Sequence, residues 1–553
     1  MSDKEIEDID IELEGLEETE DTNKIGEVCC ADTSGVIDLK ILNRPDELKI
    51  GQPIVIDTDK YLYYCMINRL YHPSNPIAVR FANSPLTGLI PPSQIEGVRG
   101  KEFYGMADLS CLKIIPMQGG ESQDILREFD TIPPIFSKGR AVTDEEIKII
   151  YKTSEHSDSV GTLRGFKYDI PIDMEMLVKK PYGLFGRTGM GKSILNKILC
   201  LNILKHEVSQ LLLFDMQGEY GSVSRADNSK GLYWYYPDKI IMYILGQLDK
   251  KDKIIDGAES FFIYKDNITS GDIIASAQNL PEPSINVLLF IERLVRKNKI
   301  DYDNLIDAIN NIDADDYKEI NPFSLRALQN RIIPFGNYDF LRDRGERDKE
   351  DSLEDIFSKL IEGKSIVVDF GKFGTNMHLY FFIANSITRR LYEMYSRKED
   401  VTKLPPLVVI VEEAHKFLKP SIIQHTIFDR IAREMRKFQL TLAFVDQRPS
   451  QIDEEVYSQI ANSFVMHMNN QRDIDRVIRT LPNSSRWRGV ISGLLKRQCF
   501  VFGDAITVPT IIEVLNYFDE KLLKKKLESK VLLSETLEKI DKTDMAKIFP
   551  DSD

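Results

Sequence analysis

The stretch GLFGRTGMGKS, residues Gly183–Ser193, decides the fold of this chain. Four of its residues fit the pattern GxxxxGK[ST]: Gly186, Gly191, Lys192 and Ser193. Glycines in this pattern let backbone N–H groups converge on phosphate oxygens, and the helix that follows adds its favourable dipole. The apolar run YGLF precedes the loop and the helical run ILNKILCLNILK follows it, so the sequence context is right. The stretch therefore predicts a nucleotide-binding loop.

The polar residues of this loop have separate expected tasks. We expect Lys192 to contact the β- and γ-phosphates and the Ser193 hydroxyl to bind Mg²⁺. The loop residues expected around the nucleotide are Gly186, Thr188, Gly189, Gly191, Lys192, Ser193 and Ile194.

Apolar runs alternate with helical patterns across residues 169–508, which predicts a parallel α/β sheet. The runs are continuously hydrophobic, as strands buried on both faces require. Besides YGLF they are 211–216, 365–370, 407–413, 441–446 and 462–468. An insertion at about 225–360 contains helical patterns such as INVLLFIERLVRK, so we expect a small helical subdomain there.

The flanking segments differ from this core. Residues 24–132 form short β-rich runs separated by turn residues, which predicts a small barrel or a sandwich. Residues 133–168 are interpreted as a linker into the core, with the helical run DEEIKIIY. Residues 509–553 are helical and amphipathic, and they either pack on a neighbouring subunit or cover their own domain. Residues 1–23 carry eleven acids against Lys4, which is typical of a solvated, disordered tail.

The composition of the chain indicates a soluble globular protein. The chain has 553 residues, 42% of them hydrophobic and 29% charged, as in soluble globular proteins of two to four domains. It has no apolar run long enough to span a membrane and no secretory leader, so we expect a cytoplasmic protein. Six cysteines without a CxxC pair indicate neither a zinc site nor a disulfide framework. The net charge of −15 still permits a local basic channel.

Polar residues end two of the apolar runs. Glu412 and Glu413 close LVVIVEE, where one carboxylate can help to hold Mg²⁺ and the other can polarise an attacking water. Beside a nucleotide loop, this pair predicts hydrolysis rather than binding alone. Gln447 follows TLAFVD, and it either senses the γ-phosphate or caps its own turn.

Four stretches together resemble the HerA helicases, within the HerA/FtsK branch of RecA-like motor ATPases. They are GRTGMGKS, LLLFDMQGEY, VVIVEEAHKFL and IAREMRKFQLTLAFVDQRPSQIDEEVYSQIAN. The resemblance implies a RecA-like P-loop core, with the β-rich region as the family's small N-terminal barrel, followed by an inserted helical subdomain and a C-terminal helical arm. It covers nearly all of the chain from Lys24.

The resemblance also assigns roles to single residues. It implies that ATP and Mg²⁺ are the cofactors, with Ser193 and Glu412 on the metal side and Glu413 as the catalytic carboxylate. Arg436 matches an arginine that the family offers to the ATP of the neighbouring subunit. Lys180 stands where relatives often carry another interface arginine, and it lacks the bidentate guanidinium. The residues expected to carry catalysis are Glu413, Lys192, Arg436 and Gln447.

The activity implied by the resemblance is ATP-driven translocation of double-stranded DNA by a homohexamer. A separate nuclease of the NurA type, or a phage-defence effector, would act with it in DNA-end processing or antiviral defence. The alternative is an ATP-gated hexameric scaffold that assembles an effector with little translocation. Lys372, Arg486 and Arg488 are candidate DNA contacts, or ordinary surface charges.

Overall fold

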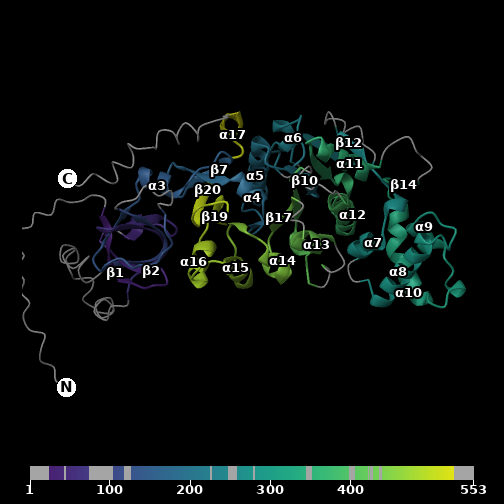
Figure 1. Cartoon of the computed structure of the whole chain (residues 1–553), viewed down its shortest axis with the longest axis horizontal. Helices are drawn as coiled ribbons and strands as arrows, with labels where there is room; N and C mark the ends of the chain where they lie inside the picture. Colours follow the sequence, from purple (N-terminus) through teal and green to yellow (C-terminus); the bar gives the residue numbers. More distant parts are fainter. Residues whose placement is uncertain are drawn as a thin grey trace, which may run out of the picture. The chain divides into compact units, whose positions relative to one another are not determined.

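The computed structural model describes most of the chain between Lys24 and Glu528 (Figure 1). The described residues are 24–42, 45–73, 104–117, 126–224, 227–246, 258–277, 280–343, 351–397, 405–416, 418–420, 423, 427–434 and 439–528. They form two compact units, divided between Thr143 and Asp144. The acidic tail at residues 1–23 lies outside the described residues.

The first unit is a closed antiparallel barrel with strand order β1-β2-β5-β4-β3-β6. Its strands are β1 (Lys24–Ala31), β2 (Val36–Ile41), β3 (Pro53–Asp57), β4 (Tyr61–Tyr71), β5 (Gly105–Pro116) and β6 (Lys138–Ala141). The predicted barrel is therefore confirmed, and a sandwich is excluded. The closing strand β6 lies beyond residue 132, so the segment interpreted as a linker begins inside the barrel.

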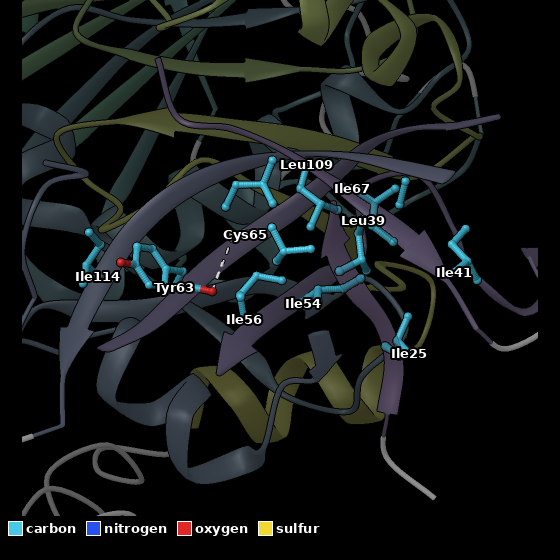
Figure 2. Packing of buried hydrophobic residues seen from close by; sticks show 13 residues of the cluster. Ile25, Leu39, Ile41, Ile54, Ile56, Tyr63, Cys65, Ile67, Leu109 and Ile114 are labelled. Atoms are coloured by element: carbon cyan, nitrogen blue, oxygen red, sulfur yellow. Dashed lines mark hydrogen bonds between the residues drawn. The ribbon is translucent and has the colours of Figure 1, made fainter. Parts of the chain in front are cut away.

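Alternating residues of these strands fill the barrel interior. Figure 2 shows Leu39, Ile54, Ile56, Ile67 and Leu109 converging from four strands, and each is fully buried. A strand alternates its side chains between its two faces, so every second residue reaches the core.

The second unit is built on a twelve-stranded sheet with order β12-β11-β15-β10-β16-β17-β9-β18-β19-β20-β7-β8. The strands from β12 to β18 are parallel, and those from β18 to β8 pair antiparallel. The bounds are β7 (Ser157–Leu163), β8 (Asp169–Asp173), β9 (Tyr182–Phe185), β10 (Gln210–Asp215), β11 (Ile240–Leu245), β12 (Ala258–Phe261), β15 (Ser365–Asp369), β16 (Leu407–Glu412), β17 (Leu440–Asp446), β18 (Asn462–Val465), β19 (Gln498–Gly503) and β20 (Thr510–Val514).

The strand order places the nucleotide loop beside the acidic strand end. β9, which leads into the loop, pairs with β17 on one side and β18 on the other, and β17 separates it from β16 with its terminal Glu412. Because these strands are parallel, their carboxyl ends share one edge, where ligands bind in open α/β sheets. The predicted parallel α/β core with the nucleotide loop at its edge is confirmed.

Helices connect and cover these strands. They are α3 (Asp144–Ile150), α4 (Met174–Val178), α5 (Lys192–His206), α6 (Leu232–Tyr235), α7 (Ser270–Ala277), α8 (Glu282–Arg296), α9 (Leu305–Asn311), α10 (Pro322–Ile332), α11 (Ser352–Ile361), α12 (Met377–Arg397), α13 (Ile427–Glu434), α14 (Glu454–Ser458), α15 (Gln471–Ile478), α16 (Trp487–Ser492) and α17 (Glu520–Glu528). Within the described part of the chain, none of them is long and apolar enough to cross a membrane.

The structure differs from three expectations about segments. The insertion at 225–360 is not wholly helical, because β11 and β12 extend the main sheet before α8, α9 and α10 pack together (Figure 1). The segment after residue 509 begins with β20 and only then forms α17. The expected linker also contains β7 of the main sheet. In each case, pairing with a neighbouring strand decides the conformation of a short segment.

Candidate active site

The nucleotide loop lies between β9 and α5, and glycines allow its backbone shape. Gly186 has φ +154°, and a Cβ there would lie 2.8 Å from Cβ of Met466. Gly191, just before α5, has φ +111°, which side chains rarely adopt. α5 then begins at Lys192, so its first free N–H groups face the loop. The loop has the form of an anion cradle at a helix N-terminus.

Lys192 lies inside this cradle. Its Nζ donates to the carbonyl oxygens of Gly186 at 2.7 Å and Arg187 at 3.3 Å. Burial lowers the pKa of the Lys192 ammonium, while Glu413 opposes that shift. A buried cation surrounded by N–H donors favours an anionic ligand, as the phosphates of a nucleotide would be.

A pocket of about 440 Å³ opens at this loop. Its lining residues are Thr188, Gly189, Gly191, Lys192, Ser193, Ile194, Gln217, Glu219, Asp227, Glu412, Glu413, Val445, Gln447, Lys496 and Phe518. The volume suits a small-molecule ligand. The pocket thus brings together nine of the residues expected from the sequence, whereas Gly186 and Lys180 do not line it.

Glu412 ends β16 within this pocket and lies among other acids. Its Oε1 accepts a hydrogen bond from Tyr220 Oη at 2.9 Å. Burial, together with the nearby carboxylates of Asp215 and Glu219, raises the pKa of Glu412 to about 8. Mg²⁺ prefers oxygen ligands and would relieve this crowding of carboxylates. The Ser193 hydroxyl and Glu412 therefore fit a magnesium site beside bound phosphates.

Asp215 shapes the loop that follows β10. Its buried carboxylate accepts backbone N–H bonds from Glu219 and Tyr220, both at 2.8 Å, and from Gly221 at 3.1 Å. Burial and the nearby Asp369 raise the pKa of Asp215 to about 6. The three bonds hold the stretch that presents Gln217 and Glu219 to the pocket. Asp215 is accordingly a positioning residue.

Glu413, Gln447 and Thr188 form one hydrogen-bonded chain. Gln447 Nε2 donates to Glu413 Oε1 at 2.8 Å, and Gln447 Oε1 accepts from Thr188 Oγ1 at 2.5 Å. Glu413 has φ +52°, and its N–H donates to Val445 O at 2.9 Å. The Gln447 side chain therefore connects the nucleotide loop to the second acid and does not cap its own turn.

Asp446 joins the ends of β16 and β17. It is fully buried, and its carboxylate lies 2.9 Å from His415 Nδ1 and accepts the Arg448 N–H at 2.6 Å. The His415 N–H donates to the same carboxylate. These bonds hold His415, which follows β16, and Arg448, which follows Gln447, so Gln447 leaves the strand in a defined direction.

Lys180 and Arg436 are the two residues expected at a subunit interface, and only Lys180 is among the described residues. Lys180 forms an ion pair with Asp504. Arg436 lies outside the described residues. On the preceding helix α13, Asp429 pairs with Arg433, with Nε at 2.6 Å from Oδ1.

Two of the three surface residues named as candidate DNA contacts, Lys372 and Arg488, pair with acids of this chain. Lys372 Nζ lies 3.2 Å from Asp339 Oδ2, and Arg488 Nε lies 2.6 Å from Asp475 Oδ1. Trp487 is buried and stacks on Phe500 with ring centroids 5.0 Å apart. Trp487 is therefore a core residue.

Several lining residues were not expected from the sequence: Gln217, Asp227, Val445, Lys496 and Phe518. Gln217 is inside the FDMQGEY stretch that carries the family resemblance, so that motif could have indicated it. Lys496 and Phe518 come from segments about 300 residues after the loop, where no motif marks them.

Comparison with known proteins agrees with this geometry. Residues 158–391 match the family model described as "Helicase HerA, central domain". The chain is 26% identical over 418 residues to the DNA double-strand break repair helicase HerA of Sulfurisphaera tokodaii, covering 71% of this chain and 75% of that protein. A HerA of Pyrococcus furiosus is 36% identical over 115 residues, which is 20% of this chain and 21% of that protein.

Solved structures with a similar arrangement include the bacterial conjugative coupling protein TrwB. It has a TM-score of 0.46 at 13% identity, over 68% of this chain and 92% of that chain. VirB4 of Thermoanaerobacter pseudethanolicus has a TM-score of 0.46 at 11% identity, over 65% and 96%. The strand order and the phosphate loop beside its acidic strand end are those of a P-loop ATP hydrolase, and the sequence of this chain is similar to the HerA helicases.

Proposed function

We propose that the chain hydrolyses ATP in this pocket in order to move double-stranded DNA as a homohexamer. The observation that carries the proposal is the chain of hydrogen bonds from Thr188 through Gln447 to Glu413. It links the loop that holds phosphate to the carboxylate placed for attack. A site with this link can report on the γ-phosphate as well as bind it.

Each residue then has a defined task in hydrolysis. The loop N–H groups and Lys192 would bind the phosphates, and Ser193 and Glu412 would hold Mg²⁺, which would supply charge neutralisation there. Glu413 orients the attacking water and accepts its proton. Gln447 releases Thr188 when a γ-phosphate is present and so couples nucleotide state to the end of β17.

The names of the relatives support the proposed substrate, and the family resemblance of the sequence supports the proposed ring. The relatives above are called DNA repair helicases, which supports DNA as the substrate. In a ring, Arg436 would approach the ATP of the neighbouring subunit and stabilise charge on the transferred phosphoryl group. A separate nuclease of the NurA type, or a phage-defence effector, would act with the ring in the cytoplasm.

Hydrolysis with and without DNA tests this proposal. ATP turnover and particle mass are measured for the wild type, Glu413→Gln and Arg436→Ala, each with and without linear duplex DNA. We expect hexamers whose turnover rises with DNA and is lost in both variants. Turnover that ignores DNA and survives Arg436→Ala would contradict the motor and favour an ATP-gated scaffold for an effector.

A further inference from the structure

Phe518 is an exposed aromatic side chain on the wall of the nucleotide pocket. Its exposed fraction is 58%, whereas that of the adjacent Tyr517 is 2%. Among the described residues that line the pocket, no other carries an aromatic ring. The phosphate chemistry described above does not use it. The exposed Phe518 ring on the pocket wall therefore has no role in the phosphate chemistry.

The backbone that carries Phe518 is held against the nucleotide-loop helix α5. Tyr517 Oη donates to Lys230 O at 2.7 Å, and the Tyr517 ring packs edge-on to Tyr235 at 6.2 Å between centroids. Lys197 of α5 is buried, and its Nζ lies 5.3 Å from the Tyr517 ring centroid. Phe518 is thus fixed relative to the helix that starts at Lys192.

A second set of contacts holds the other end of the segment. Lys205, in the last turn of α5, donates to Lys526 O of α17 at 2.8 Å. Lys526 Nζ in turn lies 2.9 Å from Asp169 Oδ2. Both ends of the segment around Phe518 are therefore anchored, and the exposed ring belongs to a fixed surface.

The positions of the polar residues of the pocket indicate which end of a bound nucleotide lies near Phe518. Glu412, Glu413 and Gln447 come from the ends of β16 and β17, where the γ-phosphate is expected. Phe518 comes from neither strand and contributes an apolar face. Nucleobases stack on aromatic side chains, and every base offers such a face.

We propose that Phe518 stacks on the base of the bound nucleotide, so that the C-terminal segment completes the ATP site. This inference rests on the proposed function and specifies how the same pocket selects its ligand. Stacking favours nucleotides over inorganic polyphosphates, and it does not depend on which base is present.

The test compares two ligands that share phosphates and differ in the base. The full chain is titrated at equilibrium with a non-hydrolysable ATP analogue and with inorganic tripolyphosphate, both with Mg²⁺. We expect Phe518→Ala to weaken the analogue about tenfold, within a range of about five- to 150-fold, and to change tripolyphosphate affinity less than about twofold. Phe518→Tyr should bind both ligands as the wild type does.

A matched control is Phe323→Ala, since Phe323 is 86% exposed on α10 and does not line the pocket. Analogue affinity unchanged in Phe518→Ala, or an equal loss for both ligands, would overturn the proposal. As a second measurement, Phe518→Trp should show fluorescence quenched by the analogue and not by tripolyphosphate, relative to the wild type. Quenching by neither ligand or by both would also overturn it.

This test separates the inference from the proposed function. Neither titration needs hydrolysis or DNA. A wild type that binds the analogue through Phe518 but shows no DNA-stimulated turnover would contradict only the translocase. DNA-stimulated turnover with no effect of Phe518→Ala on analogue binding would contradict only the stacking.

Discussion

At the scale of single residues, the site depends on a side chain that contacts both the nucleotide loop and the second acid. Gln447 is bonded to the nucleotide loop through Thr188 and to the catalytic candidate Glu413. Its amide has both a donor and an acceptor, so one side chain can serve both partners. This arrangement predicts that its loss affects turnover more than binding.

Gln447→Ala should lower kcat by about 10² and leave the KM for ATP nearly unchanged, because it removes a group that positions Glu413. Steady-state ATP hydrolysis measures both constants. The control is Gln459→Ala, at an exposed position outside the pocket. An unchanged kcat would mean that Gln447 has no part in hydrolysis.

Glu412→Gln should raise the Mg²⁺ concentration for half-maximal hydrolysis by roughly tenfold, because an amide binds a hard cation less well than a carboxylate does. Titration of Mg²⁺ at saturating ATP measures this shift, and removal of Mg²⁺ with a chelator should abolish turnover of the wild type. Glu282→Gln, at an exposed position on α8, is the matched control. An equal Mg²⁺ requirement in both variants would remove Glu412 from the metal site.

At the scale of elements, buried hydrogen bonds hold the two strand ends that carry the site. Asp446 accepts the backbone N–H groups of His415 and Arg448, beyond β16 and β17 respectively. Two adjacent parallel strands thus end in a common polar anchor. The site residue Glu413 lies two residues before His415, and Gln447 lies directly before Arg448.

Asp446→Ala should lower the free energy of unfolding by about 3 kcal/mol, because it leaves buried N–H donors without an acceptor. Thermal and denaturant unfolding of the variant measure the loss. Asp475→Ala removes an exposed ion pair with Arg488 and an exposed hydrogen bond from Gln471, and it should cost less than about 1 kcal/mol. Equal losses in the two variants would contradict the anchoring role.

At the scale of the whole molecule, the barrel and the ATPase unit have separate cores. Residues 24–143 include the closed barrel with its own buried cluster, and every residue that lines the nucleotide pocket comes after Asp144. A chain that begins at Asp144 should therefore bind the ATP analogue with affinity within about twofold of the full chain. Equilibrium titration checks this expectation. Loss of binding by a truncated chain of unchanged secondary structure would contradict it.

Local sequence was sufficient for much of the fold and for the phosphate end of the site. The glycines at Gly186 and Gly191, the following helix and the apolar runs are short-range patterns, and short-range patterns determine backbone shape. The acids at the end of β16 were also predictable. The carboxyl ends of parallel strands share one edge of the sheet, and ligands bind at that edge.

The sequence by itself therefore determined the nucleotide loop, the acidic strand end and the β-rich character of residues 24–132, because glycine geometry and the pattern of short β-rich runs act within a few residues. Only the tertiary structure decided that those strands close as a barrel. Only the tertiary structure decided that β11, β12 and β20 join the main sheet. Only it placed Lys496 and Phe518 on the pocket wall and connected Gln447 to Thr188. These contacts join segments far apart in the chain, and packing of the whole domain selects them.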